Sequence, residues 1–377
     1  MDTVTDLIVH EWIEKSGGSE RVFDEIVAAF PEADLFTLWN DHDRYPDRTS
    51  RESWIARTPL RRSKALGLPL MLPTWSRTNT AGYDRVIVSS HLFAHHIGGK
   101  NPAHRAESTF VYAHTPARYI WTPELDERGS HGLVKLVASA LKPIDRAAAA
   151  RPHAYAANSA YVQDRILASW GRESTVIHPP VDAALISAHG NWVDGLSTED
   201  LAIFESLPAE FLLGASRFVP YKRLDLVIRT GEAAGVPVIL AGGGPERAAL
   251  AALAESASVP VRIIDRPSDA LLYALYQTAL AYVFPPIEDF GIMPVEAMAA
   301  GARVIVNSEG GATESVVDGV TGVHIDAWTR AELADAVNRV AALDRADARA
   351  RAAEFDSTIF REKLLAWVNP VVVGAHK

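Results

Sequence analysis

Short apolar runs alternate with helical patterns along most of the 377-residue chain. In the first half, near-continuous apolar runs predict buried strands, because strands of a parallel sheet are usually covered on both faces. These runs are residues 5–12, 84–90, 108–114, 153–159 and 174–180. Residues 19–30 instead repeat apolar side chains every three or four positions, which predicts an amphipathic helix.

A second series of the same kind follows a polar stretch at residues 187–200. Its predicted strands are residues 210–216, 236–243, 261–265, 280–286 and 302–308. Repeated strand–helix alternation predicts parallel sheets joined by right-handed crossovers. We therefore expect an α/β fold with two doubly wound, Rossmann-like domains facing across a cleft, formed by residues 1–183 and residues 184–356.

The composition is that of a globular protein and excludes several functions. Hydrophobic residues make up 48% of the chain, yet no apolar run approaches the ~20 residues of a membrane helix. The net charge of −10 argues against nucleic-acid binding, which depends on neutralising phosphates. The absence of cysteine excludes disulfides, thiolate metal sites and thiol nucleophiles. The first residues lack the basic flank and apolar segment of a signal peptide, so we expect a cytoplasmic protein.

Basic residues are concentrated directly before an apolar run at residues 65–75. They are Arg44, Arg48, Arg51, Arg57, Arg61, Arg62 and Lys64. A solvated helical face is the favoured interpretation. The alternative is that residues 44–75 make peripheral contact with the inner face of a membrane or with an anionic acceptor, because cations attract lipid headgroups and the apolar run would add contact.

Candidate binding residues follow the predicted strands of the second domain, where ligands of open α/β sheets bind. Arg217 and Lys222 lie five positions apart on a loop that precedes an apolar-periodic helix. Two cations beside the positive end of a helix suit a diphosphate. The alternative is a solvated helix start in which Lys222 and Arg223 are simply exposed.

Glycines mark two other strand–helix turns. The triple glycine at residues 242–244 allows close backbone approach or positive φ, and Pro245 suits the start of a helix. In the first domain, Gly17 and Gly18 precede a helix whose N-terminal amides suit a phosphate. No Gly-Lys-Ser/Thr follows, so this turn is not a P-loop.

Two carboxylates, Glu288 and Glu296, flank the loop and short helix of residues 285–301. Pro294 suits the first turn of that helix and Gly301 its end, so Glu296 is expected in the first turn, where the helix dipole favours a carboxylate. Carboxylates accept hydrogen bonds from hydroxyl-rich ligands. The same ligand would meet the amides of Phe290, Gly291 and Ile292. With the two cations, this pattern predicts a ligand that carries hydroxyls and a diphosphate; a hydrolase with paired acids is an alternative.

The histidines offer weaker signals. His91, His95 and His96 could suggest metal ligands. His91 and His95 have i, i+4 spacing, but no third ligand with a clear role stands near these two in the sequence. Polar contacts at the end of the preceding strand, facing the acceptor, are therefore favoured. His114 directly follows a predicted strand, and both a functional group and a buried histidine bonded to backbone remain open for it. We expect no metal and no other cofactor.

The ordered motifs resemble those of the retaining glycosyltransferases of family 4, which have the GT-B fold. The resemblance covers nearly the whole chain and rests on "SGGSERV", "AHTPARYIW", "ANSAYVQDRI", "VIHPPVD", "SRFVPYKR" and "EDFGIMPVEAMAAG". Glu288 and Glu296 match the family's Glu-x7-Glu pattern. The family retains anomeric configuration and usually needs no metal, and its final segment, here residues 357–377, would cross back onto the first domain.

The resemblance also implies roles for the candidate residues. Arg217 and Lys222 would bind the donor's diphosphate, and Glu296 the ribose hydroxyls. Glu288 would hold the transferred sugar, with the amides of residues 290–292 assisting. Gly17 and Gly18 would approach the phosphate or acceptor, and His114 would lie near the sugar. The base would contact the segment Arg266, Pro267 and Ser268.

The motifs look most like those of bacterial mannosyl- and hexosyltransferases that build surface polysaccharide. GDP-mannose is therefore the first expected donor and a UDP-hexose the alternative, with a saccharide or lipid-linked acceptor in the first domain. Two other classes remain open: a nucleotide-sugar epimerase on the same fold, and a catalytically silent binding subunit. The intact set of Arg217, Lys222, Glu288 and Glu296 argues against the silent subunit.

Overall fold

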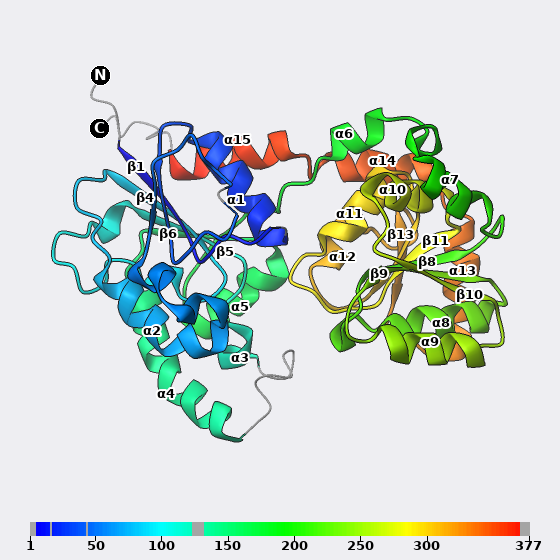
Figure 1. Cartoon of the computed structure of the whole chain (residues 1–377), viewed down its shortest axis with the longest axis horizontal. Helices are drawn as coiled ribbons and strands as arrows, with labels where there is room; N and C mark the ends of the chain where they lie inside the picture. The colour runs from blue at the N-terminus through cyan, green and yellow to red at the C-terminus, as the bar shows by residue number, and fades with distance from the viewer. Residues whose placement is uncertain (1–4, 16, 43, 123–131, 370–377) are drawn as a thin grey trace, which may run out of the picture. The chain divides into compact units, whose positions relative to one another are not determined.

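The computed structural model describes residues 5–15, 17–42, 44–122 and 132–369 (Figure 1). The chain divides into two compact units. Unit 1 comprises Met1–Pro180 and Thr358–Lys377, and unit 2 comprises Val181–Ser357. The boundary expected from the sequence, at residues 183 and 184, lies three residues from the observed one. Each unit is an α/β structure of its own.

Unit 1 has a seven-stranded parallel sheet within its described residues, in the order β3-β2-β1-β4-β5-β6-β7. The strands are β1 (Asp6–His10), β2 (Asp34–Thr37), β3 (Ser50–Glu52), β4 (Arg85–Ser90), β5 (Thr109–Ala113), β6 (Ala154–Ala157) and β7 (Thr175–Val176). The chain runs outward from β1 to β3 and then returns to β4 on the other side of β1. The topological switch point, where such sheets bind ligands, therefore lies between β1 and β4.

Helices pack apolar side chains against both faces of this sheet (Figure 1). They are α1 (Gly18–Ala29), α2 (Lys64–Arg77), α3 (Arg118–Trp121), α4 (Gly132–Ala149), α5 (Ala160–Trp170) and α15 (Ser357–Val368). On one face, α1 buries Phe23 and Ile26, and α15 adds Phe360 and Leu364 to the same cluster. Arg361 of α15 also forms an ion pair of 3.1 Å with Glu25 of α1. The last described helix of the chain is thus part of the core of unit 1.

Unit 2 has a six-stranded parallel sheet in the order β10-β9-β8-β11-β12-β13. The strands are β8 (Leu212–Arg217), β9 (Val238–Gly243), β10 (Val261–Asp265), β11 (Ala281–Phe284), β12 (Val304–Asn307) and β13 (Gly322–Ile325). The helices are α6 (Ala183–Ala188), α7 (Thr198–Glu205), α8 (Leu224–Ala234), α9 (Arg247–Ser256), α10 (Asp269–Thr278), α11 (Ile292–Ala299), α12 (Ala312–Ser315), α13 (Arg330–Ala341) and α14 (Arg345–Ala353). The switch point of this sheet lies between β8 and β11.

Strands β2, β3 and β13 were not predicted from the sequence. β3 is a polar, wholly exposed strand at the sheet edge and therefore carries no apolar signal. The helical face expected for residues 44–64 was also wrong, because this segment contains β3 and two 3₁₀ turns, Trp54–Arg57 and Pro59–Arg62. The hydroxyls of Ser53 and Thr58 each accept the N–H two residues ahead, at 3.2 and 3.3 Å, so each starts a new short turn. Within the described ranges, no helix is long and apolar enough to cross a membrane.

Candidate functional site

The main cluster of predicted site residues in unit 2 lies at the carboxyl ends of β8 and β11. Arg217 is the last residue of β8, Lys222 ends the 3₁₀ turn Pro220–Lys222, and Glu288 lies on the loop after β11. The two strands are neighbours in the sheet although two other strands separate them in the sequence. The switch point therefore brings together residues that are 66 positions apart.

Lys222 and Glu288 form an ion pair at this point. Lys222 is only 6% exposed, so the alternative of an exposed helix start was wrong for it. Its ammonium lies 5.2 Å from the ring centre of Tyr221 and 5.6 Å from that of Phe284, and both rings favour a cation. Arg217 is exposed and donates to the hydroxyl of Tyr221 at 3.0 Å. A buried cation that neutralises a carboxylate thus lies next to a second, solvent-accessible cation.

Glu296 lies on α11 and is 5% exposed. The expectation that it occupies the first turn was wrong: α11 begins at Ile292, so Pro294 is its third residue and Glu296 its fifth. Proline is tolerated there because the first N–H groups of a helix have no partner within it. Burial, and then the charge of Glu296 among other neighbours, raises the pKa of Tyr276 and of Tyr282 well above the usual value. The hydroxyl of Tyr282 donates to the carbonyl of Ala215 on β8 at 2.9 Å.

The loop that carries Glu288 is held from behind by a glycine pair after β12. The Gly311 N–H donates to the Glu288 carbonyl at 2.8 Å. A Cβ on Gly311 would lie 2.1 Å from the Asp289 carbonyl oxygen, and one on Gly310 would lie 2.9 Å from that of Glu288. Only glycine permits this approach. The sequence analysis missed this pair, which the double glycine after the strand at residues 302–308 could have revealed.

The triple glycine packs against the end of β8, as its composition allowed. Gly242 and Gly244 have φ of 146° and 154°, and a Cβ on either would come within 2.5 Å of a carbonyl oxygen, of Ser216 and Phe218 respectively. Arg266 lies beside Gly243, in the left-handed region at φ 45°.

The segment expected to contact the base follows β10. Arg266 is exposed and Pro267 half-buried. Ser268 accepts the Leu271 N–H at 3.1 Å as the cap of α10 and donates to Asp200 at 2.8 Å. Its side chain is therefore engaged in the fold, and base contact through this segment stays a prediction.

In unit 1, Gly17 caps α1 with extended backbone, and Gly18 is its first residue. The side chain of Glu20, which is 3% exposed, folds back over this turn: a Cβ on Gly17 would lie 2.2 Å from Glu20 Oε2. The Glu14 N–H also donates to this carboxylate, at 3.4 Å. A phosphate here would meet a carboxylate already present, so Gly17 and Gly18 as a phosphate site stay a prediction.

His114 belongs to a chain of polar groups at the switch point of unit 1. Ser89, on β4, lies between two imidazoles: its Oγ is 3.0 Å from His10 Nδ1 and 2.8 Å from His114 Nε2. His10 is fully buried and stacks on Phe23 at 4.6 Å between ring centres. His91 lies beside them, with ring centres 5.6 Å from His10 and 6.1 Å from His114. His10 and Ser89 were not predicted as site residues.

The hydrogen bonds of Ser89 let us assign the histidine tautomers. His10 Nε2 is buried with no partner among the described atoms, and a buried N–H without an acceptor is rarer than a bare acceptor. We therefore assign the proton of His10 to Nδ1, which donates to Ser89, and Ser89 donates to His114 Nε2. Burial lowers the pKa of His114 to about 4, so the ring is neutral at pH 7 and carries its proton on Nδ1. This nitrogen can donate to a sugar hydroxyl or a phosphate oxygen.

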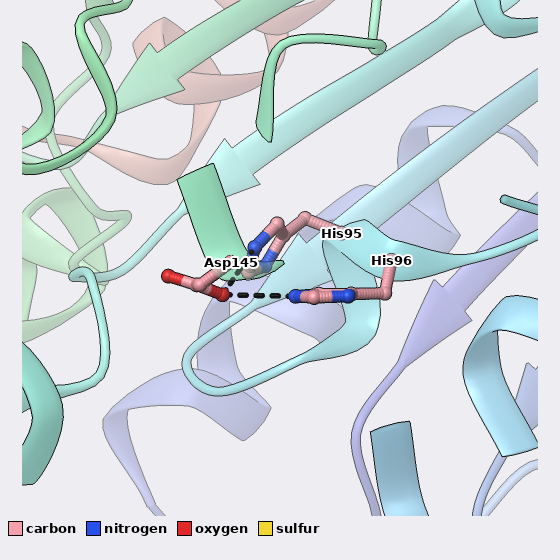
Figure 2. A group of neighbouring side chains, drawn as sticks. All are labelled: His95, His96 and Asp145. Atoms are coloured by element: carbon pink, nitrogen blue, oxygen red, sulfur yellow. Dashed lines mark hydrogen bonds and ion pairs between the residues drawn. The ribbon is translucent and has the colours of Figure 1, made fainter. Parts of the chain in front are cut away.

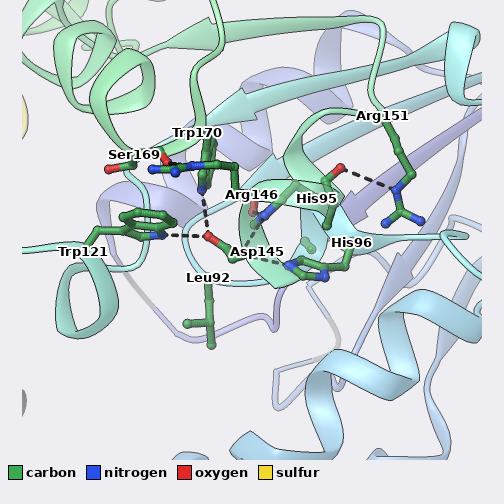
Figure 3. Close-up of polar contacts among 12 residues, drawn as sticks. Leu92, His95, His96, Trp121, Asp145, Arg146, Arg151, Ser169 and Trp170 are labelled. Atoms are coloured by element: carbon green, nitrogen blue, oxygen red, sulfur yellow. Dashed lines mark hydrogen bonds and ion pairs between the residues drawn. The ribbon is translucent and has the colours of Figure 1, made fainter. Parts of the chain in front are cut away.

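His95 and His96 lie in a separate buried cluster around Asp145 of α4 (Figure 2). Their Nε2 atoms are 3.0 and 2.8 Å from Asp145 Oδ1. Two indole N–H groups, of Trp121 and Trp170, each donate to Oδ2 at 2.7 Å (Figure 3). Burial alone would raise the pKa of Asp145, but the charge of His95 and the hydrogen bonds from both histidines hold it well below the usual value.

The donor set of this cluster suits hydrogen bonding better than a metal. The three potential ligand atoms lie within 4.8 Å of one another. However, four N–H groups already occupy both oxygens of Asp145, and an indole N–H cannot become a ligand. We interpret the cluster as an ionised carboxylate that ties α3, α4 and α5 to the turn after β4. The absence of a metal requirement stays a prediction.

Parts of the chain match a known protein family and known proteins. Residues 202–355 match the family model of glycosyl transferases group 1. The chain is 32% identical over 208 residues to D-inositol 3-phosphate glycosyltransferase of Mycolicibacterium smegmatis, which covers 51% of this chain and 46% of that protein. The protein of the same name from Mycobacterium bovis is 32% identical over 166 residues, or 41% and 33% of the two chains. The chain thus spans less than half the length of the curated relatives it matches.

Solved structures resemble nearly the whole chain. Anabaena HepE in complex with UDP has a TM-score of 0.71 at 20% identity and covers 97% of this chain and 99% of its own. Sucrose-phosphate synthase from Thermosynechococcus elongatus has a TM-score of 0.69 at 17% identity, covering 96% and 97%. These similarities confirm the predicted GT-B architecture of two Rossmann-like α/β domains with parallel sheets. Membership of family 4 and mannosyl specificity stay predictions.

Proposed function

We propose that the protein is a retaining glycosyltransferase that moves a hexose from a nucleotide-diphosphate sugar to a saccharide or lipid-linked acceptor. The observation that carries this proposal is the buried Lys222–Glu288 ion pair at the switch point of unit 2, with the exposed Arg217 at the end of the adjacent strand. The pair lets a carboxylate stay beside an anionic ligand, because Lys222 neutralises its charge. The match of residues 202–355 to glycosyl transferases group 1 supports the same function.

Each side chain then has a chemical task. Arg217 and Lys222 stabilise the negative charge that develops on the departing diphosphate, in a site that excludes part of the water. Glu288 accepts a hydrogen bond from a hydroxyl of the transferred sugar, and Glu296 accepts from the ribose. His114, neutral and protonated on Nδ1, donates to the sugar or its phosphate. The acceptor hydroxyl attacks the anomeric carbon on the face that the diphosphate leaves, the bond from that carbon to the phosphate oxygen breaks, and the hydroxyl proton passes to the departing phosphate. This same-face attack retains the configuration without Glu288 as a nucleophile.

The donor has two candidate forms. GDP-mannose follows from the sequence resemblance, and a UDP-hexose is the alternative. The similarity to a protein solved with UDP and with UDP-glucose supports the UDP-hexose. Cytoplasmic location and metal-independent transfer are part of the same proposal.

Calorimetric titration of UDP and GDP into the wild type and Lys222→Met tests the site. Methionine keeps the length of the stem and removes the charge. A charged hydrogen bond contributes about 1.5–3 kcal/mol, so we expect the affinity for the preferred nucleotide to fall about 10- to 100-fold. Lys363→Met, on α15 of unit 1, is the matched control and should bind as the wild type does.

A double variant separates two causes of that loss. If the loss came only from exposing the ligand to the unpaired charge of Glu288, Lys222→Met with Glu288→Gln would regain wild-type affinity, and direct contact of Lys222 with the diphosphate would be wrong. If Lys222→Met bound the nucleotide as tightly as the wild type does, the assignment of the diphosphate to this site would be wrong. Turnover of the donor without any acceptor would instead indicate an epimerase.

A further inference from the structure

The basic segment before α2 is not a uniform cationic patch. Three of its seven basic residues are paired with acids of unit 1. The ion pairs are Arg44–Asp24, Arg61–Asp41 and Lys64–Glu14. The charge available to a membrane surface is therefore smaller than the sequence suggested. Another of the seven, Arg51, instead lines a surface cavity.

This cavity has a volume of about 450 Å³ and lies between β3 and the C-terminal half of α2. Its volume is within the range of about 300–1,000 Å³ that small-molecule sites occupy. In the sheet order of unit 1, β3 is the outer strand and β2 separates it from β1. The cavity is thus a different place from the switch point that holds Ser89 and His114.

Two guanidinium groups that form no ion pair within the described residues line the cavity. Arg51 donates to the hydroxyl of Tyr83 at 3.1 Å and lies 5.5 Å from the centre of that ring, which fixes its position without neutralising its charge. Arg77, in the last turn of α2, is exposed and has no hydrogen-bond or ion-pair partner among the described residues. Glu52 also lines the cavity, where its Oε1 accepts the Asn40 N–H, so the lining carries one carboxylate against two guanidinium groups. Guanidinium groups match the geometry of phosphate and carboxylate oxygens.

An aromatic ring completes the wall. Trp54 is 53% exposed, although a large apolar ring normally lies inside a domain. Its Nε1–H donates at 3.1 Å to the hydroxyl of Thr74, which itself donates to the Leu70 carbonyl at 2.7 Å. The indole is therefore held in one orientation beside the cavity. A flat ring of this kind offers an apolar surface to the C–H face of a sugar.

The rim offers hydrogen-bonding groups for hydroxyls. The Oδ1 of Asn79 accepts the N–H of Ala81 and a side-chain N–H of Asn101, both at 2.9 Å. The side-chain N–H groups of Asn79 have no acceptor among the described residues, so they can donate to a ligand. The Thr78 hydroxyl donates to the Thr74 carbonyl at 2.9 Å and keeps its lone pairs for acceptance. Donors and acceptors around an aromatic surface are what a sugar ring requires.

We propose that the cavity between β3 and α2 binds a saccharide that carries a phosphate or carboxylate group. Trp54 covers one face of the sugar, Arg51 and Arg77 bind its anionic group, and Asn79 contacts its hydroxyls. The site would hold a remote part of a charged glycan or a separate sugar phosphate. It does not depend on the transfer reaction proposed for unit 2.

Calorimetry on the full chain tests this site with four probes: glucose 6-phosphate, glucuronate, glucose and inorganic phosphate. We expect at least one of the two anionic sugars to bind, and to bind at least tenfold more tightly than glucose or phosphate alone. Its affinity should fall at least tenfold in Arg51→Gln/Arg77→Gln and severalfold in Trp54→Ala. Arg62→Gln, an exposed arginine outside the cavity, is the matched control and should bind as the wild type does.

Several results would overturn the proposal. Failure of both anionic sugars to bind, or equal binding by the double arginine variant, would mean that the cavity is not their site. If inorganic phosphate bound as tightly as the sugar phosphate, the cavity would be an anion site that does not recognise sugars. An affinity for the anionic sugar that is unchanged in Trp54→Ala would lead to the same conclusion. Repeating the titration on Lys222→Met separates the two sites, because loss of UDP affinity there should leave the sugar affinity intact.

Discussion

Lowering the pH from 7 to 5 should destabilise unit 1 far more than unit 2. Burial lowers the pKa of His10 to about 3, and that of His96 and His114 to about 4. In an unfolded chain each would titrate near its ordinary value of about 6.5. Between these values the unfolded state binds the proton and the folded state does not. Stability therefore falls as the pH decreases from about 6.5 towards 4.

The size of the effect follows from the same values. Consider a histidine whose pKa is about 6.5 in the unfolded chain and about 3–4 in the folded one. Between pH 7 and pH 5, its contribution to the free energy of unfolding falls by about 2 kcal/mol. For His10, His96 and His114 together, the loss of unfolding free energy is about 5–6 kcal/mol, which is comparable with the whole stability of a typical domain. Burial also lowers the pKa of His91 well below its usual value, so His91 adds to this loss. Glu11 acts in the opposite direction: burial raises its folded pKa, so its contribution grows as the pH falls and offsets part of the loss. His10, His96 and His114 all belong to unit 1.

Urea denaturation followed by tryptophan fluorescence measures this difference, because seven of the nine tryptophans belong to unit 1. Removing one buried histidine, as in His114→Gln, should reduce the pH-dependent loss of unfolding free energy by about 2 kcal/mol. His153→Gln, an exposed histidine of the same unit, is the matched control and should leave the loss unchanged. A fluorescence transition whose midpoint is the same at pH 7 and pH 5 would refute the reasoning.

Three substitutions test the switch point of unit 2 and the Asp145 cluster of unit 1. Glu288→Gln should lower the transfer rate about 100-fold, since it removes an acceptor that the sugar uses. It should not weaken nucleotide binding, because it also frees the charge of Lys222 for the diphosphate; equal losses in both would place it in the nucleotide site. Gly311→Ala should lower the transfer rate, because a Cβ 2.1 Å from a carbonyl oxygen displaces the loop of Glu288. The fractional loss of transfer rate should exceed the fractional loss of stability in urea, and a wild-type transfer rate would contradict this. Asp145→Asn should lower the free energy of unfolding in urea by about 3–5 kcal/mol, because the amide NH₂ would face two of the four donors and the negative charge is lost. A loss below about 1 kcal/mol would show that the carboxylate is not ionised.

The order of strands and helices could be predicted because parallel strands and amphipathic helices carry distinct apolar periods. Of the unpredicted strands, β3 had no such signal because it is polar and lies at the sheet edge, and the 3₁₀ turns after it are set by the hydroxyls of Ser53 and Thr58. β2 and β13 are mostly buried, but each is only four residues long. The position of Glu296 was missed by one turn because Pro294 is acceptable anywhere in the first turn of a helix.

The candidate site shows the same division. Arg217, Lys222 and Glu288 could be found because each directly follows a strand, but their pairing depends on the return of the chain to β11, which local sequence does not encode. Asp145 lies within a helix, 49 residues from His96, so no spacing rule joined it to the histidines. His10 looked like any residue at a strand end until the sheet order brought it to Ser89.

The packing of α15 on unit 1 has a consequence for synthesis of the chain. Unit 2 is one continuous segment, Val181–Ser357, and all of it leaves the ribosome before Phe360 and Leu364 do. Unit 1 needs those two side chains to close the cluster that Phe23 and Ile26 begin, more than 330 residues earlier. The inserted unit can therefore finish folding while the unit that surrounds it in the sequence still has an open apolar face. A released chain that ends before residue 358 would carry a complete second unit and an unfinished first one.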